Sequence, residues 1–232
     1  REVLRLREEM SVCRNNREME KARDILSQIK EKVSDEVEEN RQYIMEVEAS
    51  LDWIEGRITK EEFVAKEEEA LRCTLKVKDL YDMDDVYLTE METICICKAS
   101  LGLEGKKKKD TINFLINVFE HLNQKNMLTD CIIMYEFVMG CVVSELGNWG
   151  EYKKAIVLNK KTLKESLKCR RVWGCDGYVY EIMWNYIKQN NISKPFMEKE
   201  EMTEYLRQCI ILSHFCKQTH YEKFYREKLC QV

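Results

Sequence analysis

Glycine and proline are scarce in this chain, whose 232 residues include eight glycines and one proline. These two residue types supply most of the tight turns between strands, so a sandwich or barrel of many short strands would need more of them. Hydrophobic residues make up 44% of the chain and charged residues 34%, which allows a buried core beneath a solvated surface. The sequence therefore predicts an all-α protein.

Apolar residues recur at helical spacing with short breaks between the runs. The first two runs are separated by Asn15 and Asn16. Ser34 is predicted to cap a helix that stops at Gly56, and Thr59 with Glu62 has the spacing of a capping box. Thr219 with Glu222 has the same spacing. Further helices are predicted at 86–102, 110–123, 129–147, 151–168, 172–189, 198–217 and 220–230, after a connecting loop at 76–85.

Helix pairs recur along the chain. The residues around Ile112 and those around Ile156 open helices in the same way, 44 residues apart. A two-helix unit at such a period is typical of an α-solenoid, in which each antiparallel pair buries its apolar face against the next. We therefore expect one domain over 1–232, a tetratricopeptide-like α-solenoid forming a right-handed superhelix.

Charge and hydropathy exclude several classes of protein. The formal charge of −4 gives no reason to expect direct nucleic-acid binding. The longest apolar run, 132–143, is too short for a membrane span and contains Glu136. The four lysines at 106–109 are interpreted as a solvated turn between helices. The eleven cysteines accompany no signal peptide, so we expect a cytoplasmic protein whose reduced thiols pack as small apolar side chains.

Catalytic and metal-binding motifs find little support. None of the three histidines follows a glutamate by three residues, and neither a nucleophile elbow nor a phosphate-binding loop occurs. Cys216 and His220, near His214 and Cys209, are the best candidate zinc ligands. Packing explains them more simply, because Thr219 is predicted to start a new helix between them. The sequence predicts no enzyme activity, no metal and no cofactor.

One segment, 145–163, resembles the turn and second helix of a tetratricopeptide repeat. Gly150 stands in the turn, Tyr152 follows two residues later, and Ala155 is the small residue at the helix crossing. The likeness is partial: Val143 replaces the usual glycine of the first helix, and the 44-residue spacing exceeds the repeat's usual length of about 34.

A narrower resemblance rests on the order of four strings. These are Asn-Arg-Gln-Tyr at 40–43, Gly-Arg-Ile-Thr-Lys-Glu-Glu at 56–62, Glu-Ala-Leu-Arg-Cys-Thr at 69–74 and Leu-Thr-Glu-Met-Glu-Thr-Ile at 88–94. Together they resemble the sensor half of the peptide-pheromone-responsive regulators of Firmicutes, the Rgg and PlcR group. That resemblance implies a cytoplasmic transcription regulator that binds a short signalling peptide in a concave groove and dimerises through its C-terminal helices.

The resemblance also implies a DNA-binding helix-turn-helix, which this chain lacks. Because the chain starts at Arg1, we expect that domain upstream, and DNA contact only through it. The alternative is a stand-alone scaffold that holds a protein partner and has no DNA function. A homodimer is expected through residues after about Pro195, because the last helices carry much apolar surface: Leu206, Ile210, Phe215, Tyr221, Phe224, Tyr225 and Leu229.

The peptide site is expected on the first helix of each pair, which lines the inner face of such a superhelix. Amide side chains can satisfy the backbone of an extended peptide, arginine can bind a carboxylate, and aromatic rings can take apolar side chains. The candidate peptide-binding residues are the polar and aromatic ones in those helices: Arg41, Glu48, Thr93, Ser100, Phe137, Ser144, Tyr178, Glu181 and Asn185.

Overall fold

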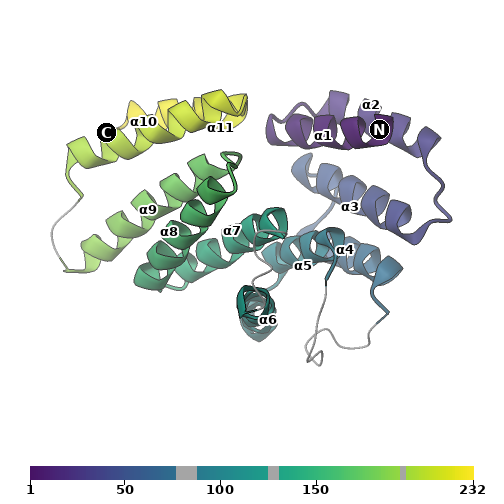
Figure 1. The fold of residues 1–232 in the computed structure, drawn as a ribbon, viewed down its shortest axis with the longest axis horizontal. Helices are drawn as coiled ribbons and strands as arrows, with labels where there is room; N and C mark the ends of the chain where they lie inside the picture. Colours follow the sequence, from purple (N-terminus) through teal and green to yellow (C-terminus); the bar gives the residue numbers. More distant parts are fainter. Residues whose placement is uncertain (77–87, 125–130, 194–196) are drawn as a thin grey trace. The chain divides into compact units, whose positions relative to one another are not determined.

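The computed structural model describes residues 1–76, 88–124, 131–193 and 197–232, and these residues form eleven α-helices (Figure 1). Most of the loop predicted at 76–85 lies outside them. In order the helices are α1 (Glu2–Asn15), α2 (Met19–Lys32), α3 (Glu38–Ile54), α4 (Lys60–Thr74), α5 (Glu90–Gly102), α6 (Gly105–Gln124), α7 (Ile132–Asn148), α8 (Tyr152–Lys168), α9 (Cys175–Ser193), α10 (Lys199–Phe215) and α11 (Thr219–Leu229).

The helices pack mainly against their neighbours in sequence, as α3, α4 and α5 do, and as α7, α8 and α9 do. The first helix of one pair also contacts the first helix of the next pair. This is seen for α3 with α5 and for α7 with α9. This arrangement confirms the predicted all-α fold and is consistent with a helical repeat.

The chain divides into two compact units. Unit 1 covers Arg1–Phe114 and unit 2 covers Leu115–Val232, so the division falls inside α6. A buried cluster in unit 1 joins α1, α2 and α3, and includes Met10, Ile29 and Leu51. A cluster in unit 2 joins α9, α10 and α11, and includes Met183, Leu206 and Tyr225.

Capping explains where several helices begin. Thr59 accepts a hydrogen bond from the backbone of Glu62, whose carboxylate accepts one from the backbone of Thr59, which confirms the predicted capping box. Thr89 and Glu92 form a second box at the start of α5, so that helix begins later than predicted. After α3, Gly56 adopts a left-handed φ of +68°, which explains the stop predicted there.

Three predictions of local structure were wrong. Helix α3 begins at Glu38, and the Ser34 hydroxyl instead accepts a hydrogen bond from the backbone of Glu36 in the preceding turn. Thr219 lies inside α11 and caps nothing, because the Glu222 carboxylate binds Arg226 and His214. The four lysines at 106–109 lie in the first turns of α6 rather than in a turn between helices.

Cysteines occupy core positions as well as surface ones. Six of the free thiols are buried, among them Cys95 and Cys209, whereas Cys131 and Cys141 are half-buried and Cys230 is exposed. Within the described part of the chain, none of the helices has the length and apolar character that crossing a bilayer demands.

Candidate functional site

Four of the predicted site residues lie inside the helix packing. Thr93 and Ser100 of α5 are fully buried, and their hydroxyls donate to backbone oxygens of their own helix, at 2.9 Å to Thr89 and 2.6 Å to Cys97. Such back-bonding satisfies the side chain locally. These two residues therefore do not face solvent.

Tyr178 and Asn185 of α9 are also buried, because they pack between α9 and α7. The Tyr178 hydroxyl donates to the backbone oxygen of Glu136 at 2.5 Å. Asn185 has no exposed surface, and its side-chain oxygen faces Gly147 of α7. The amide that the sequence assigns to peptide recognition is thus turned into the protein.

In unit 1 the remaining candidates, Arg41 and Glu48, lie on an outward side of α3. Arg41 is exposed, and the Glu48 carboxylate forms an ion pair with Lys30 of α2. Helix α2 is the second helix of its pair. The Glu48 side chain therefore points toward a second helix, and not toward the side of α3 that faces the other first helices of unit 1.

The first helices of unit 1 are tied together by a buried carboxylate. Glu46 of α3 accepts hydrogen bonds from Arg14 of α1 at 3.0 Å and from Ser50 at 3.1 Å, and it pairs with Lys98 of α5. A buried carboxylate needs such cationic and hydrogen-bonding partners, and Glu46 has both. This part of unit 1 is occupied by internal contacts.

Unit 2 differs, because α7 and α9 share a side that is partly exposed among the described residues. On α7 this side carries the predicted residues Phe137 and Ser144 with Gly140 between them, and on α9 it carries the predicted Glu181 with Gly177 and Trp184. Phe137 is 37% exposed, and Ser144, Glu181 and Trp184 are half-buried. We call these six residues the α7–α9 face.

Both glycines of the α7–α9 face border open space. A Cβ added at Gly140 or Gly177 would meet no atom within 4 Å, whereas one added at Gly147 would lie 2.9 Å from the Asn185 oxygen. Gly147 therefore permits the close approach of α7 and α9. Gly140 and Gly177 leave the surface hollow where another residue would project.

Glu181 lies beside this open space. Tyr178 contacts Glu136, and Asn185 contacts Gly147, so α7 and α9 run parallel, and Glu181 falls at about the level of Gly140. The Asn185 amide donates to the backbone oxygen of Glu181 at 2.7 Å and to its carboxylate at 3.4 Å. Burial raises the pKa of Glu181, and the hydrogen bond from Asn185 partly offsets that rise.

Gly140 and Gly177 were not predicted from the sequence as members of this surface, whereas Trp184 was expected among the aromatic residues that could line a groove. The positions of the two glycines carry a signal that could have found them: Gly140 stands three residues after Phe137 on one side of a helix, and Gly177, Glu181 and Trp184 are spaced by four and three residues. Glycine inside a helix costs stability, which marks it as unusual.

The cysteine and histidine residues considered as candidate zinc ligands make other contacts. Cys216 follows the end of α10, the His214 ring binds Glu222, and the His220 ring packs edge-on against Tyr221. In the regions with described positions, no three His, Cys, Asp or Glu side chains converge as a metal site would require.

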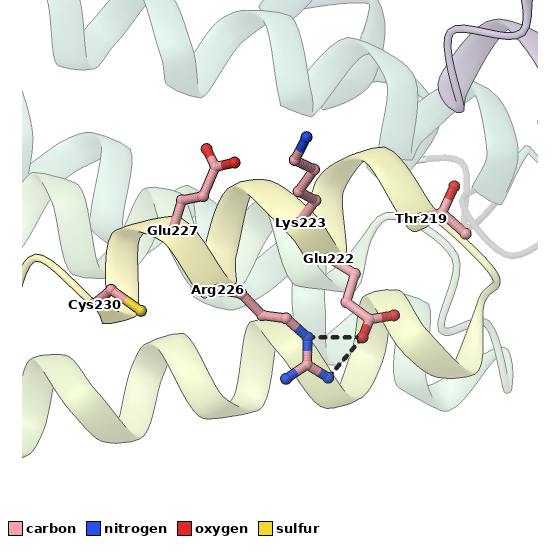
Figure 2. Close-up of a pocket in the computed structure, with 6 residues that line it drawn as sticks. All are labelled: Thr219, Glu222, Lys223, Arg226, Glu227 and Cys230. Carbon is pink, nitrogen blue, oxygen red and sulfur yellow. Dashed lines mark hydrogen bonds and ion pairs between the residues drawn. The ribbon is translucent and has the colours of Figure 1, made fainter.

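A shallow hollow of about 430 Å³ follows one side of α11 (Figure 2). It is lined by Thr219, Glu222, Lys223, Arg226, Glu227 and Cys230. Figure 2 shows the dashed contacts between Glu222 and Arg226. The Arg226 guanidinium donates to the Glu222 carboxylate at 2.7 Å and 2.9 Å. Since acids and bases alternate on a single helix here, the hollow has no net charge to select a ligand.

Comparisons of the chain with protein-family models, with curated proteins and with solved structures found no match.

Proposed function

We propose that this chain is the ligand-sensing and dimerisation part of a transcription regulator, and that it binds a short peptide on the α7–α9 face. The regulator class comes from the resemblance to the pheromone-responsive regulators. In this proposal DNA is bound by a helix-turn-helix outside the given sequence, and the signal reaches it through a right-handed tetratricopeptide-like superhelix.

The single observation that supports the peptide site is the open α7–α9 face. The exposed Phe137 and the half-buried Trp184 flank glycine positions that no atom of the described residues fills. An extended peptide buries its side chains against aromatic surface and brings its backbone close to glycine, where no side chain obstructs it. The first helices of unit 1 are less suited to bind a peptide, because Arg14 and Lys98 are already paired with Glu46.

A binding assay with a filling substitution tests this proposal. The chain is titrated with a library of hydrophobic peptides of five to ten residues, by calorimetry or thermal shift. Gly140→Leu should weaken binding at least tenfold, because the new side chain starts from a position where a Cβ meets no atom within 4 Å and projects into the open space. Since that position is open, the variant should keep the melting temperature of the parent within a few degrees.

The matched control is Lys161→Ala on the outward side of α8, which should bind peptides as the parent does. Equal affinity of Gly140→Leu and the parent would place the peptide elsewhere. If no peptide binds, while a folded protein partner does, the scaffold alternative is correct.

A further inference from the structure

Glu181 is an acidic side chain with no cationic partner in the described part of the chain. Among the residues that the structure places, no lysine, arginine or histidine nitrogen lies within 4 Å of its carboxylate, and the Asn185 amide is its hydrogen-bond donor. Glu136, on the neighbouring α7, is instead paired with Arg171 at 2.9 Å. A half-buried carboxylate gains from an opposite charge, because water screens such a pair less than one at the surface.

Room for that opposite charge exists at the same place. Gly140 lies at about the level of Glu181 on the adjacent helix, and Gly177 lies one turn before it on its own helix. Neither glycine has an atom within 4 Å of the position of a Cβ. Alanine would fit at both positions and would favour the helix. Packing within the protein therefore does not explain why both positions are empty.

The surroundings of Glu181 suit a cation on an apolar stem. Trp184 lies three residues further on the same side of α9, and Phe137 lies one turn before Gly140. The Lys188 ammonium already lies 5.4 Å from the centre of the Trp184 ring, an arrangement that aromatic rings favour with cations. Lysine and arginine lay their methylene groups along apolar surface while the charged end reaches a polar partner.

Asn185 holds the carboxylate in place. Its side chain is fully buried, and its amide nitrogen donates to both the backbone oxygen and the carboxylate of Glu181. No donor among the described residues binds its side-chain oxygen. An amide fixed in this way limits the rotamers of Glu181. Asn185 therefore acts as a positioning residue rather than as a direct contact for the peptide.

We propose that Glu181 is the anchor for a positively charged group of the bound peptide, and that this group enters the space left by Gly140 and Gly177. The inference rests on the proposed peptide function and narrows it to peptides that carry an ammonium or guanidinium group at this point. The charge can come from a lysine or arginine side chain or from a free amino terminus, which present the same chemistry.

Three peptide libraries distinguish these sources. The first contains acetylated, amidated hexapeptides of hydrophobic residues with one lysine at each position in turn. The second has norleucine in place of lysine, and the third has the norleucine sequences with a free amino terminus. The parent should bind members of the first or the third library about tenfold or more tightly than their uncharged counterparts, as expected for a charge-assisted hydrogen bond.

Glu181→Gln should abolish that preference. It should lower the affinity for the charged peptides about tenfold and change the affinity for the norleucine peptides less than twofold. Glu204→Gln removes an exposed carboxylate from α10 and should leave the preference intact, which separates a local contact from the overall charge. Thermal melts of both variants confirm that each is folded.

Each result decides between the two proposals. If the parent binds norleucine peptides as tightly as the charged peptides, Glu181 is not an anchor for a cation. The proposed peptide site is then still supported. A preference for charge that survives in Glu181→Gln also overturns the anchor. Failure of all three libraries to bind overturns both.

Discussion

At the scale of single residues, Glu67 of α4 is a carboxyl group buried inside unit 1. It has no exposed surface, and no N–H or O–H donor of the described residues reaches its carboxyl oxygens. The Cys95 thiol and the Arg14 guanidinium face it. Burial nevertheless dominates and raises the pKa of Glu67 to about 8. The folded protein therefore holds this carboxyl protonated at neutral pH.

The raised pKa predicts how stability depends on pH. The unfolded chain releases the Glu67 proton near pH 4.5, whereas the folded chain keeps it up to about pH 8. Between these values the folded state binds more protons, so the free energy of unfolding falls as the pH rises. Glu67→Gln should remove this fall and stabilise the protein at pH 8 by up to a few kcal/mol relative to the parent.

Urea unfolding at pH 5, 6.5 and 8 measures the effect. The control is Glu69→Gln, which changes an exposed carboxylate of the same helix and should keep the pH dependence of the parent. If Glu67→Gln and the parent lose stability in parallel, the carboxyl is ionised in the folded state and the burial argument fails.

At the scale of helices, the two glycines of α7 predict opposite effects of the same substitution. Gly147→Ala would place a Cβ 2.9 Å from the Asn185 oxygen and 3.0 Å from the Trp184 ring, so it should destabilise the protein by roughly 1–3 kcal/mol. Gly140→Ala meets nothing and should stabilise by up to about 1 kcal/mol through helix propensity. Thermal melts of the two variants check the sign. Equal shifts would mean that α7 and α9 do not approach at Gly147.

The crossing of α8 gives a second prediction at this scale. Ala155 is fully buried, as expected of the small residue at a helix crossing. Ala155→Leu should therefore cost roughly 1–3 kcal/mol through overpacking. Val157→Leu, at an exposed position two residues later, serves as the control in the same melting experiment and should leave the transition in place. If Ala155→Leu melts at the same temperature as the parent, Ala155 does not lie at a helix crossing and the assigned boundaries of the repeat are wrong.

The sequence predicts where most helices lie, but it does not predict which of their side chains are buried against another helix. The stop at Gly56 and the start at Thr59 follow from local backbone chemistry, so both were predictable. Ser34 and Thr219 have the right residue type for a cap, but the backbone groups that they would satisfy lie elsewhere. The burial of Asn185 depends on Gly147 of another helix, and no pattern within α9 reports that contact.

At the scale of the whole molecule, the C-terminal apolar residues on which the predicted dimer rests are partly buried within unit 2 and partly exposed. Leu206, Ile210 and Tyr225 are buried within unit 2 and are not available to a partner. Phe215 is 72% exposed, and Ile211, one turn earlier on α10, is 67% exposed. Tyr221 of α11 is 38% exposed, so these three side chains are apolar surface that a second copy could cover.

We expect the chain to form a homodimer through α10, with Ile211 and Phe215 at its centre. Light scattering at micromolar concentration should give about twice the 27.8 kDa of one chain. Phe215→Glu should reduce the mass to that of one chain, because a charge buried in an apolar interface is costly. Val157→Glu introduces the same charge at an exposed valine of α8 and should leave the dimer intact. A parent that scatters as a single chain would contradict the dimer.

The pairing of each helix with its neighbours in sequence has a consequence for how the chain forms. Contacts that are close along the chain close short loops, which costs little entropy and allows rapid folding. On the ribosome, the early pairs of unit 1 can assemble while later residues are still being added, because none of their main partners lies far downstream. Apolar surface such as that of α2 is then covered during synthesis rather than after release.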